Sequence, residues 1–194
     1  MSTKEKILED SLTLFSKQGY DGTSVEQIAQ SVGIKAPSLY KHFKGKEEIL
    51  NAIIDSAEAR YEESFGSEKN IGKLPESKEE FVLATMGKLS FTMHDPLIRK
   101  IRMLLVQEQF RNPRFAQITT KHQMEGVQKM YERIIEGMMK KGLFIEEDPQ
   151  MLSVELTGPA VLLIAKADRE PQSSEQILKD LEKHIRHFCK VYMK

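Results

Sequence analysis

Residues 23–50, TSVEQIAQSVGIKAPSLYKHFKGKEEIL, contain two short helical patterns joined by a glycine. The first pattern places a small residue, Ala29, where a second helix has to cross closely. Gly33 follows at a point where the chain needs a positive φ, which glycine adopts at low cost. Leu39 and Phe43 then anchor the second helix from beneath. This pattern predicts a helix-turn-helix, a motif whose second helix enters the major groove of DNA.

The residues before this stretch predict the third helix of the same small domain. Ile7, Leu8, Leu12 and Phe15 recur at helical spacing and form one apolar face. We therefore expect a three-helix DNA-binding domain over residues 1–50 and a second helical domain over residues 51–194.

The charge of the chain gives no general support for DNA binding, because 29 lysines and arginines balance 29 acids. Four lysines nevertheless fall within twelve residues that contain no acid, namely Lys35, Lys41, Lys44 and Lys46. Lys46 lies at a predicted helix start, where a cation opposes the helix dipole, so we expect a compensating partner such as a phosphate.

The predicted DNA-binding domain has no arginine, since the first one in the chain is Arg60. The bidentate contact of arginine with guanine is therefore excluded there. We expect Lys35 or Lys41 to read guanine, and Ala36 and Pro37 to meet thymine methyl groups.

Helical spacing and helix-start signals extend along the rest of the chain and predict an all-α protein of about nine helices. Pairs such as Ser2 with Glu5, Thr23 with Glu26, Ser77 with Glu80 and Ser173 with Gln176 fit capping boxes. The expected helices are Thr3–Gln18, Ser24–Val32, Pro37–Phe43, Lys46–Phe65, Lys78–His94, Pro96–Phe110, Pro113–Lys141, Pro149–Ala167 and Ser174–Met193. A polar stretch, Gly66–Ser77, predicts a linker.

The last two helices have the composition of a dimer interface. The segment 150–166 is apolar on nearly every side, and the final helix carries an apolar stripe with charges opposite. Two such helices from each of two chains predict a four-helix interface. The interface residues expected are Leu156, Val161, Ile164, Ile177, Leu181, Ile185 and Phe188.

The sequence lacks the signals of several other protein classes. It contains no glycine-rich phosphate loop, GxSxG elbow or HExxH motif, so neither an enzyme nor a cofactor is expected. His184 and His187 share a helix face that Cys189 does not share well, so no metal site is expected. The single cysteine, the absence of an apolar secretory core at the start and the absence of a long apolar run predict a cytoplasmic protein without a membrane span.

The pieces GYDGTSVEQIA, VGI and LYKHFKGKEEIL resemble the DNA-binding domain of the TetR family over residues 3–50. The resemblance implies a homodimeric repressor that binds a two-fold symmetric operator in double-stranded DNA and is released by a small-molecule effector. The DNA-binding residues that it implies, together with the motif, are Thr23, Ser24, Lys35, Ala36, Pro37, Ser38, Tyr40, Lys41, His42 and Lys46.

The resemblance also implies an effector pocket in the second domain, where nine of the ten methionines lie. Methionine adapts its shape and suits varied apolar ligands, although an ordinary helical core has the same composition. The candidate pocket residues are Phe91, His94, Met103, Gln107, Phe110, Met124 and Glu155. Two alternatives remain open at this point: an interaction protein of TetR type that acts on a protein partner, and a helical ligand-binding protein or enzyme with a vestigial DNA-binding domain.

Overall fold

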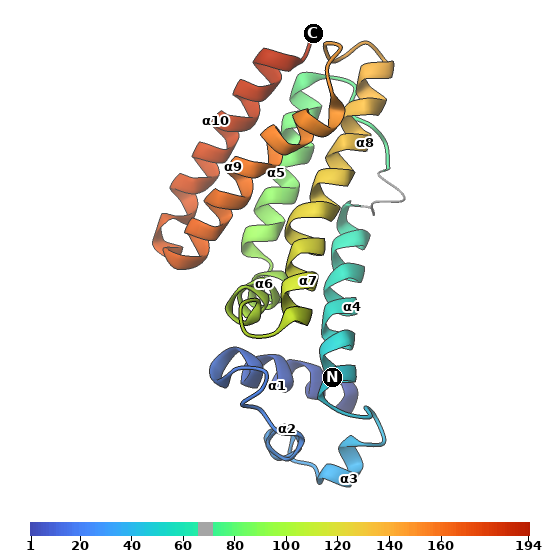
Figure 1. Ribbon diagram of the computed structural model, residues 1–194, viewed down its shortest axis with the longest axis vertical. Helices are drawn as coiled ribbons and strands as arrows, with labels where there is room; N and C mark the ends of the chain where they lie inside the picture. Colours follow the sequence, from blue (N-terminus) through green and yellow to red (C-terminus); the bar gives the residue numbers. More distant parts are fainter. Residues whose placement is uncertain (66–71) are drawn as a thin grey trace. The chain divides into compact units, whose positions relative to one another are not determined.

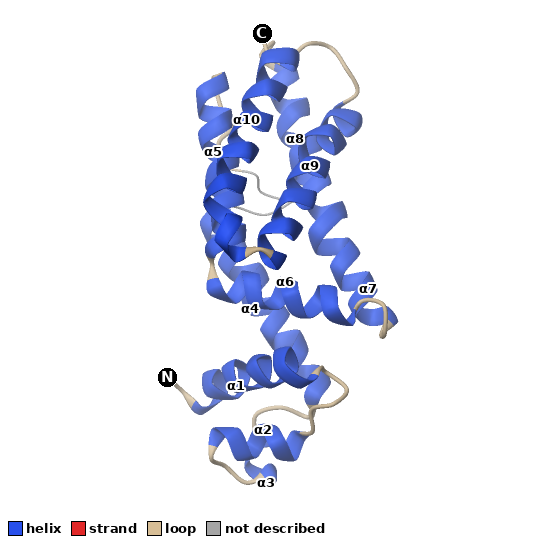
Figure 2. Ribbon diagram, turned by 90° about the vertical axis from the view of Figure 1, so that its left-hand side faces the viewer, coloured by secondary structure: helices blue, strands red, loops and turns tan. Residues whose placement is uncertain are grey.

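The computed structural model describes residues 1–65 and 72–194, and its regular structure is helical (Figure 1). A π-helical turn, Lys121–Glu125, connects α7 to α8, and a 3₁₀ turn, Pro171–Ser173, precedes α10. Figure 2 draws no strand in these ranges, and the prediction of an all-α protein is confirmed. The α-helices are α1 (Thr3–Gln18), α2 (Val25–Val32), α3 (Ala36–Leu39), α4 (Lys46–Phe65), α5 (Lys78–His94), α6 (Pro96–Glu108), α7 (Pro113–Thr120), α8 (Gly126–Lys140), α9 (Pro149–Arg169) and α10 (Ser174–Tyr192).

The predicted helices correspond closely to the observed ones. The single helix expected over Pro113–Lys141 consists of α7, the π turn and α8. The largest difference is α3, which ends at Leu39, whereas the prediction continued to Phe43. Of the predicted linker, residues 66–71 lie outside the described residues.

The predicted helix starts are confirmed where the cap depends only on neighbouring residues. Ser2 Oγ accepts a hydrogen bond from the Glu5 N–H (3.2 Å), and the Glu5 carboxylate accepts one from the Ser2 N–H (2.7 Å). Ser77 Oγ likewise accepts a bond from the Glu80 N–H at 3.1 Å. The cap predicted at Ser173 is wrong, because a 3₁₀ turn leads directly into α10 and Ser173 already has helical φ and ψ.

The chain divides into two compact units, and each is discontinuous in sequence. The first unit comprises Met1–Tyr61 and Pro96–Gln117, so it includes α6 and the start of α7 as well as the helix-turn-helix. Ile7 and Phe15 of α1, Ile28 of α2 and Leu39 of α3 are fully buried in it. The domain boundary at residue 50 stays a prediction.

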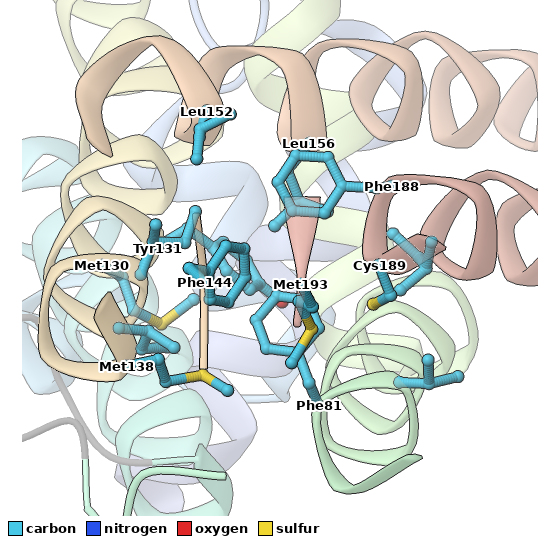
Figure 3. Packing of buried hydrophobic residues seen from close by; sticks show 14 residues of the cluster. Phe81, Met130, Tyr131, Met138, Phe144, Leu152, Leu156, Phe188, Cys189 and Met193 are labelled. Atoms are coloured by element: carbon cyan, nitrogen blue, oxygen red, sulfur yellow. The ribbon is translucent and has the colours of Figure 1, made fainter. Parts of the chain in front are cut away.

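The second unit, Glu62–Asp95 and Ile118–Lys194, is a bundle in which α9 contacts α8 and α10, and α10 contacts α5 (Figure 1). Figure 3 shows its core, in which aromatic rings from several helices and from the loop between α8 and α9 meet. The Phe81 ring of α5 lies 5.8 Å from that of Phe144 and 6.4 Å from that of Phe188 on α10. Such ring pairs add to the stabilisation from buried area.

The predicted dimer-interface side chains need correction. Six of them, Leu156, Ile164, Ile177, Leu181, Ile185 and Phe188, are buried within this single chain, and Val161 is half-buried. The apolar stripe of α10 packs on α5 and α9 of the same chain, so the six buried side chains are not exposed to a partner.

A different part of α9 faces solvent. Met151, Val154 and Leu162 are exposed by 54%, 42% and 69%, and Gly158 and Pro159 between them are exposed as well. These positions recur every three or four residues and form one helix face.

In the described part of the chain, no helix is both long and apolar enough to cross a membrane.

Candidate nucleic-acid interface

The first helix of the motif, α2, begins at a capping box formed one residue later than predicted. Ser24 Oγ accepts a hydrogen bond from the Gln27 N–H (3.2 Å), and the Gln27 side-chain oxygen accepts one from the Ser24 N–H (2.8 Å). Thr23 is buried, and its hydroxyl donates to the Gly19 carbonyl at 2.8 Å. The predicted Thr23–Glu26 cap is therefore wrong. The Thr23 hydroxyl is occupied inside the chain, whereas Ser24 remains exposed.

The turn between the two helices has the geometry that the sequence predicts. Gly33 ends α2 with φ 78° and ψ 29°, the left-handed conformation that glycine adopts without strain. The Ile34 N–H then bonds to the Ala29 carbonyl at 2.9 Å, which satisfies an open carbonyl at the end of α2. Ala29 is 2% exposed, as a close helix crossing requires.

The second helix turns a polar face to solvent because its apolar side is anchored. Leu39 and Phe43 are buried beneath it. After Leu39 the chain continues in a turn in which the His42 N–H donates to the Leu39 carbonyl at 2.8 Å. Lys35, Pro37, Tyr40, Lys41 and His42 are exposed, and Ala36 and Ser38 are half-buried. These are the residues for which base or phosphate contacts are expected.

Lys46 has a different environment from the one expected. Its Nζ donates to the Tyr20 carbonyl at 2.7 Å and lies 4.5 Å from the centroid of the Tyr20 ring. The partner that compensates this cation at a helix start therefore belongs to the chain itself. Lys46 therefore does not need a phosphate to compensate its charge at the start of α4.

The structure adds residues that the sequence analysis missed. Lys6 Nζ donates to the Val32 carbonyl (3.2 Å) at the end of α2, and Lys4 Nζ lies 5.5 Å from the Phe43 ring centroid. Lys6 thus ties α1 to the end of α2, and Lys4 ties it to the turn after α3. No local sequence signal marks them, because their partners are 26 and 39 positions away.

The candidate effector residues are distributed over both units. Met103, Gln107 and Phe110 lie in the first unit, and Phe91, His94, Met124 and Glu155 lie in the second. Phe110 is 91% exposed and Met124 is 51% exposed, so both side chains face solvent. His94 is exposed with its Nδ1 2.9 Å from the Ser90 carbonyl, and Glu155 accepts a hydrogen bond from the Tyr192 hydroxyl (2.5 Å). Phe91 and Met103 are half-buried.

A hollow of about 340 Å³ in the second unit is lined by other residues of α5 and α10, among them Lys78, Arg186 and Lys190. Arg186 is engaged there, because its guanidinium holds both carboxylate oxygens of Glu79 at 2.9 and 3.0 Å. His184, considered above as a metal ligand, donates from Nε2 to the Leu156 carbonyl at 3.0 Å.

The geometry of residues 1–50 defines a helix-turn-helix protein of the kind that presents its second helix to DNA. Residues 7–53 match the model of the bacterial regulatory proteins of the tetR family. The resemblance inferred from the sequence is thereby confirmed for this segment.

Among curated proteins, the IcaR negative transcriptional regulator of the biofilm operon icaADBC from Staphylococcus epidermidis is 47% identical over 53 residues. Its counterpart from Staphylococcus aureus strain Newman is 49% identical over 51 residues. These matches cover 27% and 26% of this chain and only 29% and 27% of the relatives. The matched segment is therefore less than a third of those regulators.

Solved structures are similar over the whole chain. SmeT, the repressor of the Stenotrophomonas maltophilia multidrug efflux pump SmeDEF, has a TM-score of 0.74 at 19% identity and covers 100% of this chain and 92% of its own. SmeT in complex with triclosan has a TM-score of 0.81 at 18% identity, with 100% and 93% coverage. These similarities show the fold of both units.

Proposed function

We propose that this chain is a transcriptional repressor that binds a two-fold symmetric operator as a homodimer and is released by a small molecule. The observation that carries the proposal is the exposed polar face of residues 35–42, held by the buried anchors Leu39 and Phe43 in a tetR-type motif. The two curated regulators described above are named as negative transcriptional regulators, and their similarity to this segment favours repression.

DNA binding is tested with the purified chain and the DNA upstream of its own gene. We expect sequence-specific binding that weakens steeply as salt rises, because neutralised phosphates release counterions. Equal affinity for unrelated DNA at every salt concentration contradicts the proposal.

Base reading is tested at Lys35, the exposed residue at the start of α3. Lys35→Ala should relax the preference at one position of each half-site, at a cost of about 1–3 kcal/mol for the preferred base. Lys129→Ala removes the same charge from an exposed site in the second unit and is the control. If Lys35→Ala weakens all sequences equally, Lys35 contacts phosphate and the base-reading assignment is wrong.

Release by an apolar or amphipathic molecule is supported by two observations. Met86 and Met139 are half-buried against the aromatic core of the second unit, where flexible side chains can adapt to a ligand. SmeT, a structural neighbour, is known as a complex with triclosan. Triclosan and a panel of cationic amphiphiles are therefore the probes, and we expect one of them to weaken operator binding. Operator affinity that no member of the panel alters contradicts this part of the proposal.

A further inference from the structure

Tyr20, in the loop between α1 and α2, is held between two aromatic rings. Its ring centroid lies 5.1 Å from that of Phe15 on α1 and 5.2 Å from that of Phe115 on α7, which meets it edge-on. Phe15 and Phe115 are fully buried, and Tyr20 is half-buried. Burial raises the pKa of the Tyr20 hydroxyl above its usual value. The loop that leads into α2 is thus anchored to α7 as well as to α1.

The backbone of Tyr20 joins two further helices. Its N–H donates to Oε1 of Glu108, the last residue of α6, at 3.2 Å. Its carbonyl accepts the bond from Lys46 Nζ at the first residue of α4 (2.7 Å), and the same Nζ lies over its ring. Glu108, Tyr20 and Lys46 form one chain of contacts from α6 to α4, which we call the Tyr20 clasp.

The position of Glu108 is unfavourable for α6 alone. A carboxylate at the last residue of a helix faces the negative end of the helix dipole, and burial adds a desolvation cost. Glu108 is only 4% exposed. Gly19 permits its approach, because a Cβ at that position would lie 3.0 Å from Oε1. The hydrogen bond from the Tyr20 N–H therefore offsets part of the cost of burying this carboxylate.

Other side chains tie the same segment to the helix-turn-helix unit. Lys100 of α6 donates to the Thr13 hydroxyl of α1 at 2.7 Å. Arg114 of α7 forms an ion pair with Glu47 of α4 at 2.6 Å and a hydrogen bond with Asn51. Residues 96–117 therefore belong to the first unit, although the chain on both sides of them, Glu62–Asp95 and Ile118–Lys194, belongs to the second.

We propose that Glu108 is a positioning residue through which α6 sets the affinity of the helix-turn-helix for DNA. Resting on the proposed function, this inference names a contact within the first unit on which DNA affinity depends. Glu108 holds the Tyr20 backbone, which fixes the loop before the Ser24 cap and also holds Lys46 at the start of α4. Loss of this carboxylate therefore releases the Tyr20 backbone, and with it the loop before α2 and the contact with Lys46.

The test compares three variants of the full chain. Glu108→Ala removes the acceptor, Glu108→Asp withdraws it by one methylene but keeps the charge, and Glu108→Gln keeps an oxygen acceptor. We expect Glu108→Ala and Glu108→Asp to speed hydrogen exchange of the Tyr20 amide and to weaken operator binding about three- to tenfold, the scale of one hydrogen bond. Glu108→Gln should retain slow exchange and bind within about twofold of the parent chain.

Glu9→Ala is the control, because Glu9 is an exposed acid on α1 in the same unit. Removal of a negative charge alone should leave DNA affinity unchanged or raise it, which is opposite in sign to the effect expected for Glu108→Ala. Circular dichroism and thermal unfolding establish that each variant is folded. If Glu108→Ala does not fold, Glu108→Asp against Glu108→Gln decides the question.

Two results overturn the proposal in different ways. If the parent chain binds its operator and Glu108→Asp binds equally well despite faster Tyr20 exchange, the clasp does not control DNA affinity. Unchanged Tyr20 exchange in every folded Glu108 variant shows that the hydrogen bond is not what holds the loop. Failure of the parent chain to bind any DNA is a failure of the proposed function itself, and the exchange data still test the clasp.

Discussion

Cys189, the one cysteine of the chain, lies in the core of the second unit and is 2% exposed. Burial raises the pKa of its thiol to about 11. The thiolate is the reactive form of cysteine, so a raised pKa and a covered sulfur both suppress its chemistry. The side chain acts as a small apolar residue of the cluster that also contains Phe81 and Phe188 (Figure 3).

We expect the native thiol to react with a disulfide reagent at pH 8 at least about tenfold more slowly than the unfolded chain, because burial raises the pKa of the thiol and covers the sulfur. The rate should rise as the pH approaches 11, because a group with a raised pKa loses its proton later than in the unfolded chain. Release of the chromophoric thiol from the reagent measures both rates. Equal rates for native and unfolded chains at pH 8 contradict the assignment.

At the scale of elements, most boundaries could be predicted because caps and glycine turns depend on residues within four positions. The start of α2 shows where this fails. Glu26 follows Thr23 by three residues, and Gln27 follows Ser24 by three, so the capping-box pattern fits either start. The choice is made by tertiary contacts, since Thr23 is buried against the end of α1 and accepts a bond from Gln18 at 3.2 Å.

Ser24→Ala should lower the free energy of unfolding by about 1 kcal/mol, because the Gln27 N–H loses its acceptor at the start of α2. Urea unfolding followed by circular dichroism measures the change. Ser56→Ala, at an exposed position inside α4, is the matched control and should leave stability unchanged or slightly raise it, since alanine is the better helix former. A Ser24→Ala chain as stable as the parent would show that the cap contributes nothing.

At the scale of the whole molecule, the sequence predicts which residues are apolar but not which apolar faces meet. The predicted apolar stripe of α10 is present, but α5 and α9 of the same chain cover it. Lys46 shows the same limit for the candidate site, because its partner Tyr20 lies 26 positions away. The exposed residues of the second helix of the motif could be predicted, since the buried anchors Leu39 and Phe43 fix its orientation locally.

The proposed homodimer is therefore assigned to the exposed face of α9, which carries Met151, Val154 and Leu162 around the small residue Gly158. Exposed apolar side chains in a row favour association with a second copy, and a two-fold interface brings the same face of both chains together. Leu162→Glu places a charge in this contact, and the second chain contributes the same charge by symmetry. By sedimentation velocity at micromolar concentration, we expect the parent chain to be a dimer and the variant to be a monomer.

Leu83→Glu is the matched control, because Leu83 is a leucine of similar exposure (64% against 69%) on α5 of the same unit. It should leave the dimer intact, so a loss of dimer in both variants points to general destabilisation instead. Loss of the dimer should also weaken operator binding, since two recognition helices then no longer engage adjacent half-sites together. A Leu162→Glu chain that remains dimeric and binds its operator as the parent does would place the interface on another face.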